Sequence, residues 1–182
     1  MSGGAINIIR LVIDLYATVL LVRLLLQLVQ ADFLNPISQT IFKITGPVVE
    51  TLNKLFPTIG KFNTAALVGA VLIKWSFFII MIGFGKVLVE QLPTYLFVAA
   101  LQLLGTLIQI YFYGILIMAI SSWVGTTNHP TVRVVNQIID PYMKPFRSVI
   151  PPIGMIDLSP MVAIFTLMFI RGQVLPMLNG LI

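Results

Sequence analysis

Four long apolar stretches divide the sequence, at about residues 6–30, 64–89, 95–124 and 158–178. Each is near or above the roughly 20 residues that an α-helix needs to cross a lipid bilayer. The pattern predicts an all-α membrane protein with four transmembrane helices. A cleaved signal peptide is an alternative for the first stretch. We favour a retained helix, because residues 1–9 contain no Lys or Arg and the apolar run exceeds a signal core of about 7–15 residues.

The two halves of the chain follow one pattern: an apolar stretch, a segment punctuated by proline, and a second apolar stretch. Six positions of the first half recur with the same spacing in the second, Pro36, Ile44, Pro47, Pro57, Ile59 and Gly60 matching Pro130, Ile138, Pro141, Pro151, Ile153 and Gly154. We expect two membrane repeats, residues 1–92 and 93–182. Because each contains two crossings, both would have the same orientation, related by a pseudo-two-fold axis along the membrane normal.

The segments between the crossings of each repeat are too polar to span a membrane and are amphipathic. In the first, Ile37, Ile41 and Ile44 recur at helical spacing, and in the second Val132, Val135, Ile138 and Ile139 do so. A second segment with apolar residues at helical spacing then begins at Pro47 in the first repeat and at Pro141 in the second. The pattern predicts short amphipathic helices, two per repeat, lying in the interface plane.

Proline and small polar residues mark the expected helix starts, since Pro suits the first turn and Asn or Asp can cap it. Asn35 or Asp140 can act as such caps, Asn63 precedes the second crossing, and Asp157 with Ser159 precedes the fourth. The residues expected to have structural roles are Pro36, Pro47, Pro57, Gly60, Pro130, Asp140, Pro141, Pro151, Gly154, Asp157, Ser159 and Pro160.

Composition supports a membrane protein and limits its chemistry. Hydrophobic residues make up 58% of the 182 residues and charged residues 9%, against roughly a quarter charged in a soluble domain. The chain has no cysteine and one histidine, His129, so it cannot itself form disulfides, thiolate metal sites or a C-x-x-C-H haem attachment site. It also lacks the G-x-S-x-G, H-E-x-x-H and glycine-rich phosphate motifs. We expect neither an enzyme nor a bound cofactor.

The net charge of +5 is best explained by the orientation of the chain in the membrane and by contact with anionic lipid. We expect no direct nucleic-acid partner. Six basic residues belong to the two intervening segments, Lys43, Lys54, Lys61, Arg133, Lys144 and Arg147, whereas Arg10, Lys86 and Arg171 lie near the opposite face. Because basic residues favour the cytoplasmic side, we expect a multi-pass protein of the inner (plasma) membrane. Its intervening segments would be cytoplasmic and both termini outside.

Four charged residues fall within the expected crossings, Asp14, Arg23, Lys74 and Arg171. An unpaired charge at the membrane centre costs about 2.5–3.5 kcal/mol on insertion scales, so these side chains need partners or water. One interpretation is a salt bridge that fixes helix register, with Arg23 snorkelling to the interface. The other is a polar seam that conducts or binds an ion, for which an anion suits the excess of positive charge.

The second intervening segment also contains a candidate surface site. Lys144, Arg147 and Arg133 supply positive charge, and Tyr142 and Phe146 are expected to turn toward lipid. Such a segment would bind anionic headgroups or the acidic tail of a partner, at about 1 kcal/mol per basic residue. Snorkelling of the basic side chains is the alternative. Gly105 and Gly114 would permit close helix contacts within the chain, and they are also available for contact with a partner subunit.

The most specific residues are in the second repeat: Ser122-Trp123, His129-Pro130, the run from Asp140 to Arg147, and the run from Ile150 to Pro160. This string resembles the signature of the YggT family of integral membrane proteins in its two-repeat form. The first repeat differs, with Asn53 at the position of Arg147 and Ala65-Ala66 at that of Ser159-Pro160. The resemblance implies an inner-membrane protein linked to osmotic or potassium stress and cell division, with plastid relatives in haem attachment and nucleoid distribution.

Three functions are consistent with these observations. The first is a non-enzymatic scaffold or assembly factor in the bilayer, acting as a homo-oligomer or with a membrane-protein partner in osmotic-stress, envelope or division physiology. The second is a small-solute or ion pathway along Asp14, Lys74 and Arg171. The third is an accessory factor in haem-protein maturation, which would need thiols and haem ligands from a partner.

Overall fold

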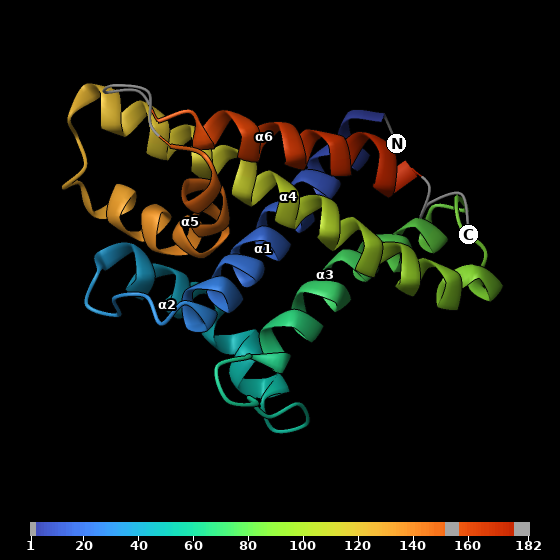
Figure 1. Ribbon diagram of the computed structural model, residues 1–182. Coiled ribbons are helices and arrows are strands. Elements are labelled where there is room, and N and C mark those ends of the chain that lie inside the picture. The colour runs from blue at the N-terminus through green and yellow to red at the C-terminus, as the bar shows by residue number, and fades with distance from the viewer. Residues whose placement is uncertain (1–2, 152–156, 177–182) are drawn as a thin grey trace.

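The computed structural model describes residues 3–151 and 157–176, and within them the chain forms helices and no strand (Figure 1). The order is α1 (Gly3–Leu28), α2 (Pro36–Leu52), α3 (Thr64–Gly83), the 3-10 turn η1 (Val89–Gln91), α4 (Leu92–Val124), α5 (Pro130–Val149), α6 (Ser159–Phe169) and the π-helical η2 (Ile170–Val174). The prediction of an all-α fold is confirmed for the described residues.

Two of the described helical segments are long and apolar enough to cross a membrane, Thr64–Gly83 and Val89–Val124. They correspond to the second and third predicted crossings. The 26-residue α1 matches the first, but it includes Arg10, Asp14 and Arg23. The fourth predicted crossing begins with the 11 residues of α6 and changes to a π-helix at Ile170. Four crossings remain a prediction.

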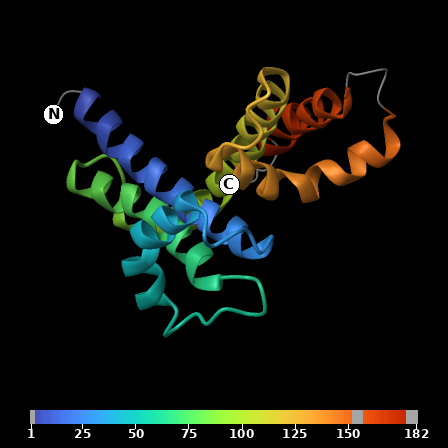
Figure 2. The same cartoon turned by 90° about the vertical axis from the view of Figure 1, so that its left-hand side faces the viewer.

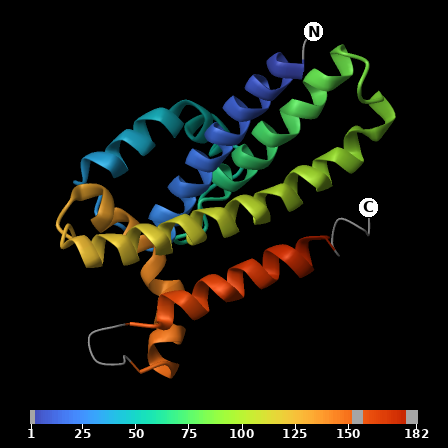
Figure 3. The ribbon, with the colours of Figure 1, turned by 90° about the horizontal axis from the view of Figure 1, so that it is seen from above.

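The helices of the two halves gather in two groups. Figure 2 shows α1, α2 and α3 on one side and α5 and α6 on the other, and Figure 3 shows the long α4 running between them. In Figures 1 and 3, α2 and α5 lie toward one end of the molecule, and the start of α1, the α3–α4 connection and the end of η2 lie toward the other. We call these the α2/α5 end and the terminal end.

Apolar side chains form two buried clusters that fix this arrangement. One joins α1, α4, α5 and α6 through residues such as Leu26, Ile115, Ile139, Met143 and Ala163. The other joins α1, α2 and α3, with one residue from α4, through Ala17, Leu20, Leu21, Leu24, Val49, Ala65, Ala66, Ala70 and Leu103. Helix α1 therefore packs in both clusters.

The prediction of two short helices in each intervening segment is wrong. Pro47 lies inside the continuous α2, and Pro141 and Pro145 lie inside the continuous α5. Each proline removes one backbone donor, but packing of the surrounding side chains can hold a helix together across such a site. Asp140 consequently lies within α5 and is not a cap.

The buried face of each intervening helix also differs in part from the predicted one. In α5, Val132, Ile138 and Ile139 are buried as expected, together with Met143. In α2, Ile44 is 49% exposed whereas Ser38 and Thr45 are fully buried. Small polar side chains allow the α2 backbone to approach its neighbours, which rotates the helix away from its most apolar face.

Polar caps start several helices where the sequence suggests. The Asn35 side chain accepts a hydrogen bond from the Ile37 amide at 2.9 Å, and the Asn63 side chain accepts one from the Ala66 amide at 2.8 Å. The Asp157 carboxylate accepts from the Ser159 amide at 2.9 Å. Such bonds satisfy amides that have no partner inside a helix.

The remaining structural positions fall in turns and first turns. Pro36, Pro130 and Pro160 lie in the first turns of α2, α5 and α6. Pro57 and Pro151 are exposed in connections, and Gly60 has a φ of 60°, a conformation in which a side chain would be strained. Gly154 lies outside the described residues.

Candidate functional site

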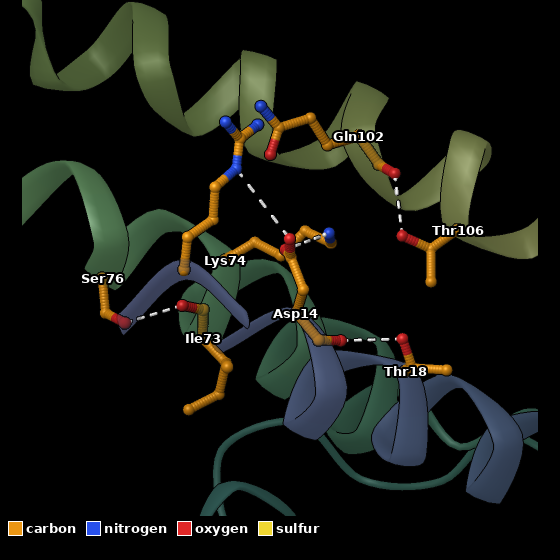
Figure 4. Close-up of polar contacts among 8 residues, drawn as sticks. Asp14, Thr18, Ile73, Lys74, Ser76, Gln102 and Thr106 are labelled. Atoms are coloured by element: carbon orange, nitrogen blue, oxygen red, sulfur yellow. Dashed lines mark hydrogen bonds and ion pairs between the residues drawn. The ribbon is translucent and has the colours of Figure 1, made fainter. Parts of the chain in front are cut away.

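Asp14 and Lys74 form the shortest ion pair of the described chain. The Lys74 ammonium donates to the Asp14 carboxylate at 2.7 Å, which joins α1 to α3 (Figure 4). The guanidinium of Arg10 lies 3.9 Å from the other carboxylate oxygen. The Lys74 side chain is only 7% exposed, whereas the Asp14 side chain is 42% exposed. Asp14 therefore has one buried partner and one at the surface.

These residues line a cavity of about 310 Å³ enclosed by α1, α3, α4 and η2. Its polar lining consists of Arg10, Asp14, Lys74, Gln102, Thr106, Gln109 and Arg171, with Leu101, Gly105 and Leu175 completing the wall. We call it the terminal pocket. Three of the four charges expected in the membrane, Asp14, Lys74 and Arg171, are thus brought together from three elements.

The terminal pocket lies at a common depth in three helices. Asp14, Lys74 and Gln102 are each about ten residues from the terminal-end limits of α1, α3 and α4, or roughly 15 Å at about 1.5 Å per residue. Helices that run side by side bring residues at equal depth to the same level. Polar side chains from three separate parts of the sequence therefore meet about ten residues in from these helix ends.

Sequence reasoning missed the contribution of α4 to this pocket. Gln102, Thr106 and Gln109 are spaced i, i+4 and i+7, so they lie on one face of an otherwise apolar helix. Figure 4 shows Gln102 on the α4 turn above Asp14. The sequence contains this signal as a polar stripe, but its three residues are uncharged and so do not stand out as the charged residues do.

An apolar layer separates the terminal pocket from the α2/α5 end. It consists of Ala17, Leu20 and Leu21 of α1, Ala66 and Ala70 of α3, and Leu103 of α4. The nearest hydroxyls bond within their own helices, Thr18 to the Asp14 carbonyl at 2.7 Å and Thr106 to the Gln102 carbonyl at 3.0 Å. On α4, Thr106 and Gln109 continue the pocket lining beyond Leu103.

Arg23, the fourth charge, lies apart from the pocket and does not snorkel as expected. It is 8% exposed. Its guanidinium donates to the Thr45 hydroxyl at 2.9 Å and to the Phe42 carbonyl at 3.3 Å, and lies 4.8 Å from the centre of the Phe42 ring. Because α2 packs directly on α1, the side chain finds its partners there and joins the two helices.

Arg147 is paired inside the protein and is not a free anchor. Its guanidinium lies 3.0 Å from the Asp140 carboxylate and 3.6 Å from that of Asp157. A nitrogen also donates to the Met118 sulfur at 3.2 Å. These contacts link α5 to α4 and to the segment that starts α6. Lys144 is 73% exposed and lies 3.7 Å from Asp140, and Arg133 is exposed.

The prediction that Tyr142 and Phe146 turn toward lipid is wrong. Both are half-buried against the α4–α5–α6 cluster. The Tyr142 hydroxyl donates to the Ala163 carbonyl of α6 at 3.2 Å, and its ring centre lies 5.1 Å from that of Tyr111 and 5.2 Å from that of Phe146. Burial, with a smaller effect of Tyr111, raises the pKa of the Tyr142 phenol above its ordinary value. These aromatic residues fasten α5 to its neighbours.

Metal or haem ligation finds little support in the described part of the chain. It contains no group of three His, Cys, Asp or Glu side chains placed to hold a metal ion. The His129 Nδ1 accepts a hydrogen bond from the Thr131 amide at 3.3 Å, so this histidine caps the start of α5.

The fold and its polar interior define the class: an all-α protein with two helices suited to crossing a membrane. The model of the CCB3/YggT family matches residues 2–83 and again residues 97–178. The chain therefore belongs to the CCB3/YggT family, and the resemblance found in its sequence is confirmed.

Several bacterial proteins match the chain over nearly its full length. The chain is similar to a protein of Escherichia coli K12 named "Uncharacterized protein YggT", with 37% identity over 93% of this chain and 88% of the relative. It is similar to an uncharacterised protein of Pseudomonas aeruginosa at 35% identity over 93% and 87% of the two chains. One of Haemophilus influenzae is 34% identical over 93% and 91%. No solved structure matches the chain.

Proposed function

We propose that the protein is a non-enzymatic integral membrane scaffold or assembly factor. The observation that carries this proposal is the use of polar and charged side chains to join helices. Lys74 and Asp14 join α3 to α1, Arg23 joins α1 to α2, and Arg147 joins α5 to the Asp157 segment before α6. Charges used in this way stabilise an arrangement of helices and are not free to perform catalysis.

The proposal includes four crossings arranged as two repeats. The family model matches twice, once in each half, and α3 and α4 have the length and hydropathy of membrane spans. The start of α1, the α3–α4 connection and the end of η2 gather at one end (Figure 3), as two hairpins of the same orientation require. We place this end outside the inner membrane and α2 and α5 in the cytoplasm, by the excess of basic residues there.

Helices α2 and α5 supply the surface for a partner. The Asn35 side chain donates to the Pro130 carbonyl at 2.9 Å, and the Asp32 amide donates to the Gln137 side chain at 3.2 Å. These bonds tie the starts of the two helices together. The exposed basic residues on and beside the pair are Lys43, Lys54, Lys61, Arg133 and Lys144, which suit anionic lipid headgroups and the acidic segment of a membrane-protein partner.

The two other functions have less support. A solute or ion pathway requires a polar route between the leaflets, whereas apolar residues of α1 and α3 lie between the terminal pocket and α2. A role in haem-protein maturation would rely on a partner for its ligands, because the sequence has no cysteine and its one histidine caps α5. The osmotic-stress and division setting rests on the family resemblance.

A site-specific photo-crosslinker tests the scaffold proposal in living cells. A benzophenone amino acid at Gln39, exposed on α2, should capture a defined membrane protein, identified by mass spectrometry. The same probe at Tyr113, exposed on α4, is the matched control. Capture at Gln39 should be lost when Lys43 and Arg133 are both changed to Glu. If Gln39 captures only lipid, or the same proteins as Tyr113, the scaffold proposal is wrong.

A further inference from the structure

We propose that the terminal pocket is a binding site for a phosphate-type anion, supplied either by the headgroup of an anionic lipid or by a soluble phosphate. The site is formed by Arg10, Lys74 and Arg171, with Gln102 and Gln109 as neutral donors. None of the lining residues belongs to α2 or α5, so the site is separate from the partner surface proposed above.

The charge balance of the terminal pocket favours an anion. Its lining has three cations, Arg10, Lys74 and Arg171, and a single acid, Asp14. A net positive charge held among apolar helices is unfavourable unless it is compensated. An anion with one or two negative charges would neutralise this excess, whereas a cation would increase it.

The donors of the pocket are only partly used within the protein. An ammonium group has three N–H donors, and Asp14 accepts one from Lys74 at 2.7 Å. The Arg10 side chain approaches Asp14 at 3.9 Å and stacks on the Phe77 ring, with 5.7 Å between its guanidinium carbon and the ring centre. Planar guanidinium groups match the paired oxygens of a phosphate. The pocket therefore presents several donors toward one space.

The α4 and η2 walls complete the site. Gln102 and Gln109 lie on the same face of α4, and each amide has two N–H donors. Arg171 lies in the π-helical turn Ile170–Val174. Such turns are rare and often occur at functional sites, because the wider turn changes which side chains face the neighbouring helix.

The shape of the pocket fits a small anionic group entering from the terminal end. Its volume of about 310 Å³ is at the lower end of the range for small-molecule sites. Lys74 is buried at the inner limit, and the side chains of Arg10 and Asp14 are 59% and 42% exposed at the outer limit. Apolar residues of α1 and α3 follow Asp14 and Lys74 toward α2, which favours a binding site over a conducting path.

A change at Asp14 distinguishes the proposed anion site from a purely structural salt bridge. Its carboxylate holds Lys74 and repels an anion in the same space. Changing Asp14 to Asn should weaken the contact between α1 and α3 and, at the same time, tighten anion binding. A salt bridge with a purely structural role predicts the loss of stability alone.

Two binding arms distinguish the two sources of the anion. In the first, the purified full chain in an uncharged detergent is titrated with inorganic phosphate, against chloride at equal ionic strength, and thermal unfolding is followed. In the second, the chain in phosphatidylcholine nanodiscs with increasing phosphatidylglycerol is examined by native mass spectrometry for retained lipid. An effect in the first arm alone indicates a soluble phosphate, and an effect in the second alone indicates a lipid headgroup.

Four variants complete the design. Arg10→Gln and Arg171→Gln should each weaken binding about tenfold, as expected for loss of a charged hydrogen-bond donor. Lys86→Gln removes a positive charge from an exposed position that lies outside both the pocket lining and the α2/α5 surface, and it should leave binding unchanged. Asp14→Asn should bind more tightly than the parent, and the ligand should restore part of its lost stability. If that variant does not fold, Gln102→Leu, which should bind more weakly, replaces it.

The proposal is overturned if neither arm shows binding to the parent chain. It is equally overturned if Lys86→Gln weakens binding as much as Arg10→Gln, because the effect would then be one of general surface charge. Unchanged or weaker binding by folded Asp14→Asn would also count against it. Each of these outcomes leaves the Gln39 crosslinking result untouched, so the two proposals can fail separately.

Discussion

At the scale of single residues, each buried charge lies beside a specific partner on another helix. Lys74 meets Asp14, and Arg23 meets Thr45 and the Phe42 carbonyl. A charged group that has lost its water must recover most of that hydration from its new contacts. Removing one partner should therefore be more harmful than removing an exposed charge of the same kind.

Lys74→Met should destabilise the protein by about 1–3 kcal/mol, because it leaves the Asp14 carboxylate without its closest donor. The free energy of unfolding can be measured by titration with sodium dodecyl sulfate in mixed micelles. The Asp14→Asn/Lys74→Met double variant should lose less than the sum of the single variants, since the two residues are in contact. Lys86→Met, at an exposed lysine, is the control. An equal effect of Lys74→Met and Lys86→Met would contradict this prediction.

At the scale of elements, close packing and ion pairs attach α5 to the rest of the molecule. A Cβ atom at Gly114 of α4 would lie 2.6 Å from Ile139 Cδ1 and 2.7 Å from Ile139 Cγ1 of α5. Ile139 is fully buried. The absence of a side chain at Gly114 therefore sets the approach of α4 and α5, as expected of a small residue that permits close helix contacts.

Gly114→Ala should destabilise the protein by about 1–3 kcal/mol through overpacking. The same unfolding titration measures it, with Gly83→Ala as the control, because a Cβ atom at Gly83 meets nothing within 4 Å. Combining Gly114→Ala with Ile139→Ala should cost less than the sum of the two. Strict additivity would show that the two side chains do not compete for this space.

Arg147→Ala should loosen α5 from the start of α6, because Arg147 bridges the carboxylates of Asp140 and Asp157. Faster hydrogen exchange in α5 and in the first turn of α6 is the expected result. Lys144→Ala, which removes a more exposed cation from the same helix, should change exchange little. A lipid anchor formed by both residues would instead predict similar effects, together with loss of bound anionic lipid.

At the scale of the whole molecule, the two ends carry different properties. The α2/α5 end has most of the exposed basic residues and the bonds that tie α2 to α5. The terminal end has the polar pocket of α1, α3, α4 and η2. In a membrane these ends would lie in opposite leaflets, so one protein would contact two different sets of lipids and partners.

The absence of cysteine from the sequence allows topology to be measured with single cysteines. We expect Gln39→Cys and Ser148→Cys, on α2 and α5, to be protected from a membrane-impermeant maleimide in intact cells. Thr94→Cys, at the start of α4, should be labelled. All three should react after permeabilisation, which controls for accessibility. Labelling of Gln39→Cys and Ser148→Cys on different sides would contradict the two parallel hairpins.

The sequence by itself determined the helices and their starts. Apolar length and capping are local properties, so the all-α fold, the caps Asn35 and Asn63, and the helix at 95–124, observed as α4, could be predicted within a few residues. It also identified which charges would need partners, because a carboxylate or ammonium within an apolar helix is costly wherever its neighbours lie.

Only the tertiary structure decided which partners those charges have. It paired Asp14 with Lys74, turned Arg23 toward α2, placed Arg147 between two carboxylates, and kept α2 and α5 continuous through Pro47 and Pro141. It also added Gln102 and Gln109 to the pocket. These outcomes depend on the depth and rotation of helices that are far apart in the sequence. Contacts between helices set both quantities, and a single helix pattern does not contain them.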